Sequence, residues 1–201
     1  MDPYIKNENG TLVPMSIPVS EDSVELENSE LVNNSFTENT EGVFVQPKVV
    51  GIPVNAYKTH LQTTDGIEIT ASHIMEEIEI LFSFFSNSNV HIFFEGSIYK
   101  HDTSIDKIKL LLSAQDESLQ FVITDLGITD YTFEQRYRIL TTLMENIPVL
   151  QHVVLCTTSF VKDIAELKKA HLLNTELGFE SSIVKQILLS RSSQNCVSDS
   201  R

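Results

Sequence analysis

Two aspartates near the end of an expected strand are the residues of this sequence best suited to chemistry. Asp125 follows the apolar run 119–123, Asp130 lies in the loop beyond it, and residues 156–158 end the next expected strand. Open α/β sheets bind ligands at the carboxyl ends of their strands, where paired carboxylates could share a proton or hold Mg²⁺. The same residue types also cap strand ends and helix starts, and no nucleophile with a base is evident. We therefore favour a structural role and expect no enzyme activity.

The loop that contains Asp130 is the second candidate site. It combines an acid with the aromatic Tyr131 and leads into an expected helix, whose free amides and positive dipole favour an acidic or phosphorylated group. We expect a protein partner to bind Thr129, Asp130, Tyr131 and Thr132. Two hydroxyls are candidate phosphorylation sites, Thr129 in this loop and Ser35 in an acidic context.

The common cofactor and metal motifs are absent from the sequence. Its seven glycines never approach the spacing of a phosphate-binding loop, in which small residues let backbone amides surround a phosphate. Its six histidines include no pair three or four residues apart, and its two cysteines are too differently placed to form a zinc site. We therefore expect no cofactor and no bound metal.

The charge balance limits the classes of partner. The 201 residues include 28 acidic and 14 basic side chains, a net charge of -14 that repels phosphate backbones and anionic lipids. We therefore expect no direct binding to nucleic acid. The longest apolar run, residues 78–85, is far shorter than the roughly 20 residues that span a bilayer. With no export signal and few cysteines, the sequence predicts a cytoplasmic protein, or one of the host cell or virion if it is viral.

The composition divides the chain into three parts. Residues 1–47 hold nine acidic residues and one lysine, and their apolar residues follow no sustained period. Such a segment buries too little surface to offset the entropy of ordering it. The sequence predicts a disordered acidic arm at 1–42, a globular α/β domain at 43–189 and a flexible tail at 190–201.

The pattern of apolar residues predicts alternating strands and helices in the globular part. Residues 48–70 are typical of a hairpin, because Asp65-Gly66 is a tight-turn signal. The expected helices begin near residues 72, 104, 132, 159 and 182, where residues 103–106 resemble a capping box that starts at Thr103 and residues 132–135 match one in full. The expected strands are 90–94, 119–123 and 151–156. This alternation predicts a single domain with a mixed, mainly parallel sheet flanked by helices.

The order of elements from 90 to 189 resembles the STAS domain of anti-sigma-factor antagonists. The resemblance rests on segments 91–98 (HIFFEGSI), 121–126 (FVITDL) and 172–179 (LLNTELGF). It implies a non-enzymatic regulatory module that binds a protein partner. The family carries a phosphorylated serine at the start of its second helix, whereas residues 127–132 hold no serine, and only the hydroxyls of Thr129 and Thr132 are placed to substitute for it.

A structural or assembly protein, such as a small viral matrix or accessory protein, is the alternative. The acidic arm, the apolar helix expected at 72–86 and the absence of a recognisable active site favour it. This reading allows a homo-oligomer, whereas the regulatory reading requires a different protein as partner.

Overall fold

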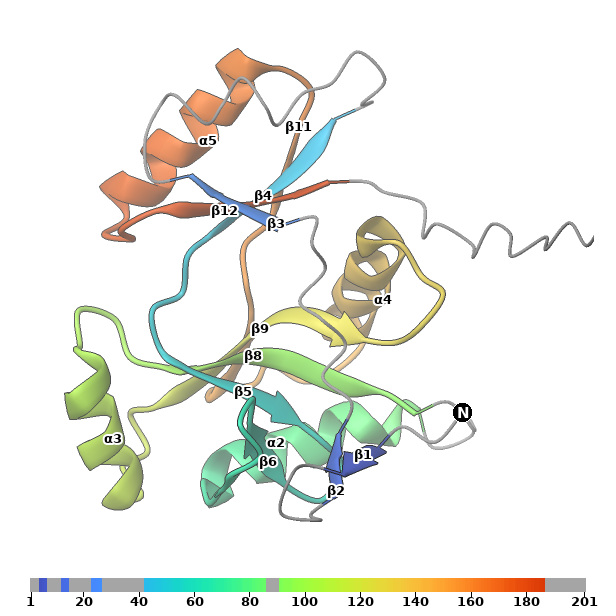
Figure 1. Ribbon diagram of the computed structural model, residues 1–201, viewed down its shortest axis with the longest axis vertical. Coiled ribbons are helices and arrows are strands. Elements are labelled where there is room, and N and C mark those ends of the chain that lie inside the picture. Colours follow the sequence, from blue (N-terminus) through green and yellow to red (C-terminus); the bar gives the residue numbers. More distant parts are fainter. Residues whose placement is uncertain (1–3, 7–11, 15–22, 27–41, 86–90, 187–201) are drawn as a thin grey trace, which may run out of the picture.

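The described part of the chain forms a six-stranded and a four-stranded β-sheet with helices packed on them, and a small two-stranded sheet. The computed structural model describes residues 4–6, 12–14, 23–26, 42–85 and 91–186. Figure 1 shows the smaller sheet with α5 at the top, the larger sheet with α2 and α3 at the bottom, and α4 at the side.

The larger part of the fold, the six-stranded lobe, contains one sheet and three helices. Its strand order is β10-β9-β8-β5-β6-β7, and β9 and β10 are its one parallel pair. The strands are β5 (Ile52–Ala56), β6 (Leu61–Thr63), β7 (Glu68–Ile69), β8 (Phe93–Tyr99), β9 (Gln120–Gly127) and β10 (Val153–Leu155). The helices are α2 (Ser72–Ser83), α3 (Ile105–Ser113) and α4 (Phe133–Glu145).

The smaller part, the four-stranded lobe, contains an antiparallel sheet of order β11-β4-β12-β3. Its strands are β3 (Ser23–Leu26), β4 (Val43–Pro47), β11 (Ser159–Val161) and β12 (Ser182–Gln186). Helix α5 (Ile164–Glu176) packs on β4 and β11. Strands β1 (Tyr4–Lys6) and β2 (Leu12–Pro14) form a separate hairpin.

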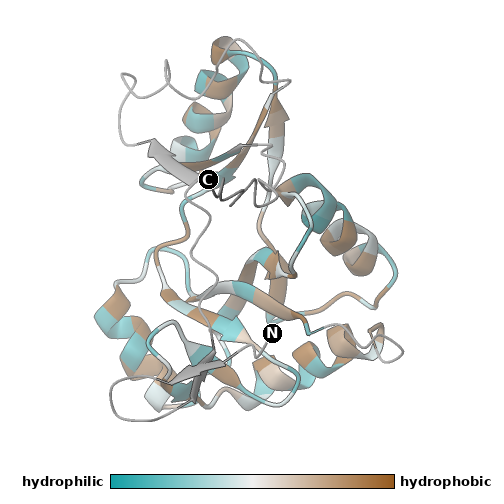
Figure 2. Ribbon diagram, turned by 45° about the vertical axis from the view of Figure 1, so that its right-hand side comes forward, coloured by the Kyte–Doolittle hydropathy of each residue, from teal (hydrophilic) through white to brown (hydrophobic). Residues whose placement is uncertain are grey.

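Each lobe has its own hydrophobic core. The larger core contains Phe94, Phe121 and the inner face of α2, all fully buried in the six-stranded lobe. The smaller core consists of five buried residues of the four-stranded lobe: Val43, Val45, Val161, Leu167 and Val184. Along the helices, hydrophobic and hydrophilic stretches alternate, as expected where one face packs on a sheet (Figure 2). The hydrophobic cores of the two lobes are therefore separate from each other.

The predicted fold class, an α/β domain with a mixed sheet flanked by helices, is confirmed. The expectation that this sheet is mainly parallel is wrong, because β8 runs antiparallel to both β5 and β9. A strand–helix–strand pattern gives parallel strands only where the connection crosses back over the sheet. Helix α3 does not make that crossing, so the chain re-enters beside β8 in the opposite direction.

Two elements in the C-terminal part differ from the sequence prediction. Residues 182–186 form β12, not a helix, because this segment, with Ile183 and Val184 β-branched, pairs with β4 along its whole length. Ser159 begins β11 and caps no helix, whereas α5 starts after Asp163, whose carboxylate accepts a hydrogen bond from the Glu166 amide. In such short segments the spacing of apolar residues fits both the helical and the strand period.

The predicted disordered arm, 1–42, and flexible tail, 190–201, lie largely outside the described residues. Ser35, the candidate phosphorylation site of the arm, is also outside them. Within the described part of the arm, β3 pairs with β12 at the edge of the four-stranded sheet. The domain boundaries stay predictions.

The capping box predicted at the start of α4 is confirmed. The Thr132 hydroxyl accepts a hydrogen bond from the Gln135 amide, and the Gln135 side chain accepts one from the Thr132 amide. We expect Thr132→Ala to lower the free energy of unfolding by about 1 kcal/mol, because it leaves a helix-start amide without its partner. Urea denaturation of Thr132→Ala and Thr132→Ser measures this, and a serine variant as unstable as the alanine variant would contradict the capping role.

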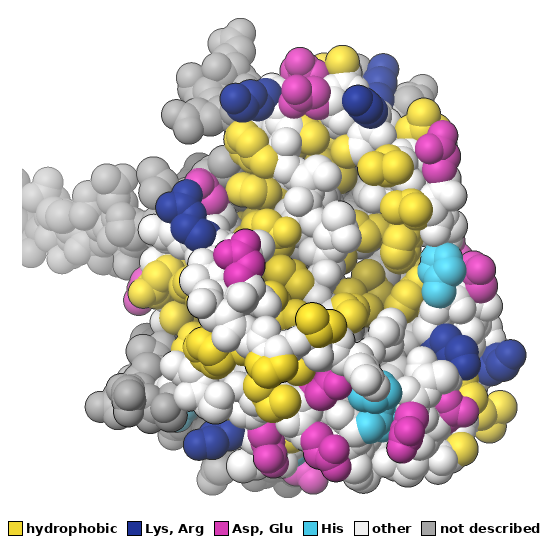
Figure 3. All heavy atoms as spheres, turned by 180° about the vertical axis from the view of Figure 1, so that it is seen from behind, with side chains coloured by type: hydrophobic (Ala, Val, Ile, Leu, Met, Phe, Trp, Pro, Cys, Tyr) yellow, Lys and Arg dark blue, Asp and Glu magenta, His cyan; other side chains and the backbone are white. Residues whose placement is uncertain are grey.

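Hydrophobic side chains are also present on the surface. Seen from behind, they gather over a broad area, with charged side chains mainly towards its edges (Figure 3). In the part of the chain that the structure describes, no helix is long and apolar enough to cross a membrane.

Candidate functional site

Asp125 is the centre of a buried ion-pair network that joins the two lobes. Its carboxylate accepts hydrogen bonds from Arg136 Nε at 2.8 Å and Nη2 at 2.9 Å, both from α4. It also accepts one from Lys185 Nζ, on β12, at 3.1 Å. Burial tends to raise the pKa of Asp125, but the bonds from Arg136 and Lys185 outweigh it and hold the pKa below its usual range. This carboxylate therefore stays ionised and fully paired.

The acidic pocket considered for Asp125 and Asp130 is not formed. Asp130 is exposed in a turn with φ of 65°, whereas Asp125 is buried at the end of β9. Cys156 is buried, and desolvation raises the pKa of its thiol to about 12, so it is a poor nucleophile. Thr158 accepts a hydrogen bond from Gln46 Nε2 at 2.9 Å. Asp125 and Thr158 therefore bond other side chains of the protein.

Glu95, on β8, lies in the same buried region as Asp125. Desolvation raises the pKa of its carboxyl, and the negative charge of Asp125 raises it further, whereas Lys185 and Arg136 lower it less. The two neighbouring acids therefore have opposite pKa shifts, one raised and one lowered. A pair of this kind is a mark of electrostatic tuning in a folded site.

The pKa shifts predict opposite pH dependence for the two acids. Because the pKa of Glu95 is raised on folding, its stabilising contribution is present at low pH and is lost as pH rises through the folded pKa. Glu95→Gln should therefore gain stability relative to the natural protein between pH 4 and pH 8. Urea denaturation of both proteins at these pH values measures the change. A stability difference that is constant across this range would contradict a raised pKa.

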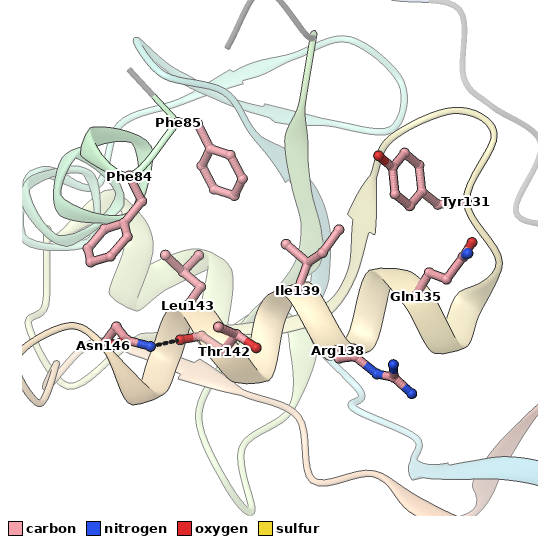
Figure 4. Close-up of a pocket in the computed structure, with 9 residues that line it drawn as sticks. All are labelled: Phe84, Phe85, Tyr131, Gln135, Arg138, Ile139, Thr142, Leu143 and Asn146. Atoms are coloured by element: carbon pink, nitrogen blue, oxygen red, sulfur yellow. Dashed lines mark hydrogen bonds between the residues drawn. The ribbon is translucent and has the colours of Figure 1, made fainter. Parts of the chain in front are cut away.

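A groove runs between α4 and the end of α2, beside the predicted partner-binding loop. Phe84 and Phe85 line one wall, Tyr131 and Gln135 lie near one end, and α4 forms its floor (Figure 4). The cavity volume is ≈ 460 Å³. Tyr131 is 43% exposed and Thr132 is the helix cap, while Thr129 and Asp130 are exposed in the turn between them and β9. Partner binding by these four residues stays a prediction.

A second pocket lies where the chain passes from β4 to β5. It has a volume of ≈ 230 Å³ and is called the Lys48 pocket here. Residues from both lobes and from the passage between them line it: Lys48, Val50, Tyr99, Asp102, Thr103, Ser104, Gly178, Phe179 and Glu180. The backbone amide of Lys48 donates to the Ser181 carbonyl at 2.9 Å, so the start of β12 fixes the position of this lysine.

The lining of the Lys48 pocket combines aromatic, cationic and hydroxyl groups. The Tyr99 and Phe179 rings are stacked, with centroids 6.3 Å apart and an interplanar angle of 18°. Ser104 caps α3 by accepting from the Lys107 amide, so the positive end of that helix dipole meets the pocket. Desolvation, with the nearby Asp102, raises the pKa of Tyr99, which keeps its phenol protonated. Aromatic rings can stack on a planar group, and a cation with free helix amides can bind phosphate. This lining therefore suits a planar ligand that carries phosphate.

Sequence reasoning missed the lysines of both sites. Lys48 stands alone among apolar residues after Pro47, and Lys185 follows Ile183 and Val184. A single base inside an apolar run is a signal that could have identified each, because a cation that loses part of its hydration needs a polar partner or ligand. Among the described residues, no group of three histidine, cysteine, aspartate or glutamate side chains could hold a metal ion.

Comparison with known proteins places the fold among DNA ligases. No protein-family model and no curated protein matches the sequence. Among solved structures, a Lig E DNA ligase matches with a TM-score of 0.57 and 15% identity, covering 77% of this chain and 59% of the ligase. The ATP-dependent DNA ligase of bacteriophage T7 in complex with ATP matches with a TM-score of 0.54 and 11% identity, covering 78% of this chain and 59% of the ligase. The Chlorella virus DNA ligase-adenylate matches with a TM-score of 0.53 and 14% identity, covering 84% of this chain and 60% of the ligase.

These matches correct several expectations from the sequence. The fold is that of DNA ligases, so the STAS resemblance and the non-enzymatic regulatory module built on it are wrong. The expectations of no enzyme activity and of no contact with nucleic acid are also overturned, because the matched proteins are DNA ligases. The STAS resemblance rested on the order of the elements, which does not define strand direction, and β8 and β9 run antiparallel here. This chain spans about three fifths of the length of these three ligases.

Proposed function

We propose that the chain is a nucleotidyltransferase of the DNA-ligase fold, and that the Lys48 pocket takes the nucleotide. The observation that carries the proposal is the position of Lys48 at the junction of the two lobes, in a pocket with stacked aromatic rings. The matched structures include a ligase bound to ATP and a ligase-adenylate, so ATP is the nucleotide that we propose.

The pocket residues have separate roles in this proposal. The Tyr99 and Phe179 rings contact the base, and the Thr103 and Ser104 hydroxyls, with the first amides of α3, contact the phosphates. The Lys48 ammonium loses a proton to solvent, and the neutral amine attacks the α-phosphorus. A bond between Nζ and phosphorus forms, the bond from that phosphorus to the oxygen bridging to the β-phosphate breaks, and pyrophosphate leaves.

A nucleic-acid end is the acceptor that we propose for the nucleotidyl group. This choice of acceptor rests on the likeness of the fold to DNA ligases. The net charge of -14 does not support it. Because the chain spans about three fifths of the matched ligases, the proposal is limited to nucleotide binding and its transfer. An intracellular location, where ATP is supplied, is part of the proposal.

Covalent labelling with ATP tests the proposal. Incubation with ATP labelled at the α-phosphate, followed by denaturing electrophoresis, should leave the label on the natural protein and on Lys100→Arg. Lys48→Arg should lose the label, because arginine keeps the charge but is not a nucleophile at neutral pH. Lys100 is the matched control, since it lies just after β8 and bonds the Ser118 hydroxyl, outside the pocket. An unlabelled natural protein that also fails to bind ATP in calorimetry would overturn the proposal.

A further inference from the structure

We propose that the two lobes hinge about two short segments and that a buried polar latch closes them over the Lys48 pocket. The latch consists of Gln46 and Lys185 from the four-stranded lobe and Thr124 and Asp125 from the six-stranded lobe. The expected effect of the latch on ATP binding rests on the proposed function, whereas the latch itself does not depend on that function.

The chain path allows such a hinge. Between residues 42 and 186, apart from the undescribed 86–90, the chain passes between the lobes twice, at 48–51 and at 156–158. Each lobe also has its own hydrophobic core. The lobes also touch through the rings of Phe44 on β4 and of Phe133 and Tyr137 on α4. Two cores joined by two short chain segments allow a hinge, in which a few terminal residues of the elements absorb the motion.

Three polar contacts between the lobes lie side by side at Thr124 and Asp125 of β9. Thr124 O, on β9, accepts from Gln46 Nε2 at 3.0 Å and from Lys185 Nζ at 3.3 Å. Lys185 Nζ also bonds Asp125 at 3.1 Å and lies over the Phe133 ring, 4.4 Å from its centroid. Gln46 is 2% exposed, so water cannot replace its bonds while the lobes stay closed. Buried polar contacts of this kind add little net stability, but they select one arrangement of the parts.

The latch and the Lys48 pocket lie at the two ends of the same strand. Strand β12 begins at Ser182, next to the pocket residues 178–180, and carries Lys185 near its other end. The pocket wall is made by residues 99–104 of the six-stranded lobe and 178–180 of the other, which contact each other through Tyr99 and Phe179. A rotation of one lobe therefore changes the width of the pocket.

The volume of the pocket gives a reason for the motion. Ligand pockets are typically about 300–1,000 Å³, whereas the Lys48 pocket has ≈ 230 Å³. The closed pocket is therefore small for a whole nucleotide, which would enter more easily with the lobes apart. Opening of the latch lets the ligand enter, and closing of the latch brings the two walls onto it.

Distance measurement between the lobes tests the latch without any ligand. Spin labels at Lys109→Cys on α3 and Lys168→Cys on α5 report the interlobe distance by pulsed electron resonance, in a background of Cys196→Ser. The remaining Cys156 is buried and unreactive. The natural latch should give one narrow distribution, Lys185→Met a clearly broader one, and Lys185→Arg, which keeps the cation, a narrow one again. Should Lys185→Met fail to fold, Gln46→Met carries the same expectation.

Arg136→Met is the matched control. It removes the other partner of Asp125, but Arg136 belongs to α4, which packs on β9 of the same lobe. Its distribution should therefore stay narrow. A Lys185→Met distribution as narrow as that of the natural protein, or equal broadening by both variants, would overturn the latch.

Calorimetry with ATP on the same variants then measures the effect on the pocket. If Lys185→Met leaves about one tenth of the molecules closed, the dissociation constant for ATP should rise about tenfold. An unchanged dissociation constant in a variant with open lobes would overturn the coupling of the latch to the pocket. Failure of the natural protein to bind ATP refutes the proposed function, whereas the distance distributions still decide the latch.

Discussion

Asp125→Asn is expected to lower the free energy of unfolding by about 3–5 kcal/mol at neutral pH, because it leaves two buried cations without their carboxylate. The side chains of Arg136 and Lys185 are 16% and 14% exposed, so water does little to compensate them. The asparagine oxygen can still accept hydrogen bonds, but it carries no charge. Chemical denaturation of the variant and the natural protein measures the loss.

The pH dependence of this loss identifies its cause. The pKa of Asp125 is lower in the folded protein than in the unfolded chain, so its contribution is present above the unfolded pKa of about 3.9. It is lost as pH falls through the folded pKa. The difference between Asp125→Asn and the natural protein should therefore shrink in acid. Asp106→Asn, which removes an exposed acid paired with Lys109, should change stability little at any pH. A loss at Asp125 that is independent of pH would contradict the electrostatic cause.

The sequence predicted the position of Asp125 but not its partners. Its place after an apolar run indicated a position near the end of a buried strand, although β9 continues two residues beyond it to Gly127. The partner Lys185 lies 60 residues away on β12, and no local pattern encodes a contact over that separation. The helix expected at 182–188 also concealed it, because the pairing of β12 with β4 and β3, and not the local apolar spacing, decides the conformation.

The sequence predictions that depend on local signals agree best with the structure. The capping box at Thr132 and the turn at Asp65-Gly66 depend on neighbouring residues, and both are present in the structure. The cap of α3 is one residue further on than expected, at Ser104. The Lys48 pocket is built from three separate segments, so its lysine gains meaning only when the lobes are assembled. This is the physical reason why the site was missed.

The expectation about nucleic acid failed for a related reason. It used the total charge of -14, and much of that charge comes from the nine acidic residues of 1–47. Net charge governs solubility and long-range association, but it does not identify a fold or a local site. The likeness to DNA ligases comes from strand order and direction, which are independent of surface charge.

Phe94→Ala is expected to lower the free energy of unfolding by about 3–5 kcal/mol, the usual cost of removing a buried aromatic ring and leaving a cavity. Phe94 is fully buried at the centre of the six-stranded lobe. Its ring meets Phe82 edge to face at 5.1 Å and Phe85 at 6.3 Å, so it joins β8 to α2. The loss should appear in chemical denaturation as a lower midpoint with an unchanged slope.

The control for Phe94→Ala is Phe84→Ala on the neighbouring helix end. Phe84 is 52% exposed and lines the α4 groove, so its truncation should cost well under half as much. Because Phe94 directly precedes Glu95 on β8, loosening this strand should also weaken the opposing pKa shifts of Glu95 and Asp125. The pH dependence of stability should therefore be flatter in Phe94→Ala than in Phe84→Ala. Equal losses in the two variants would mean that the core is not centred on β8.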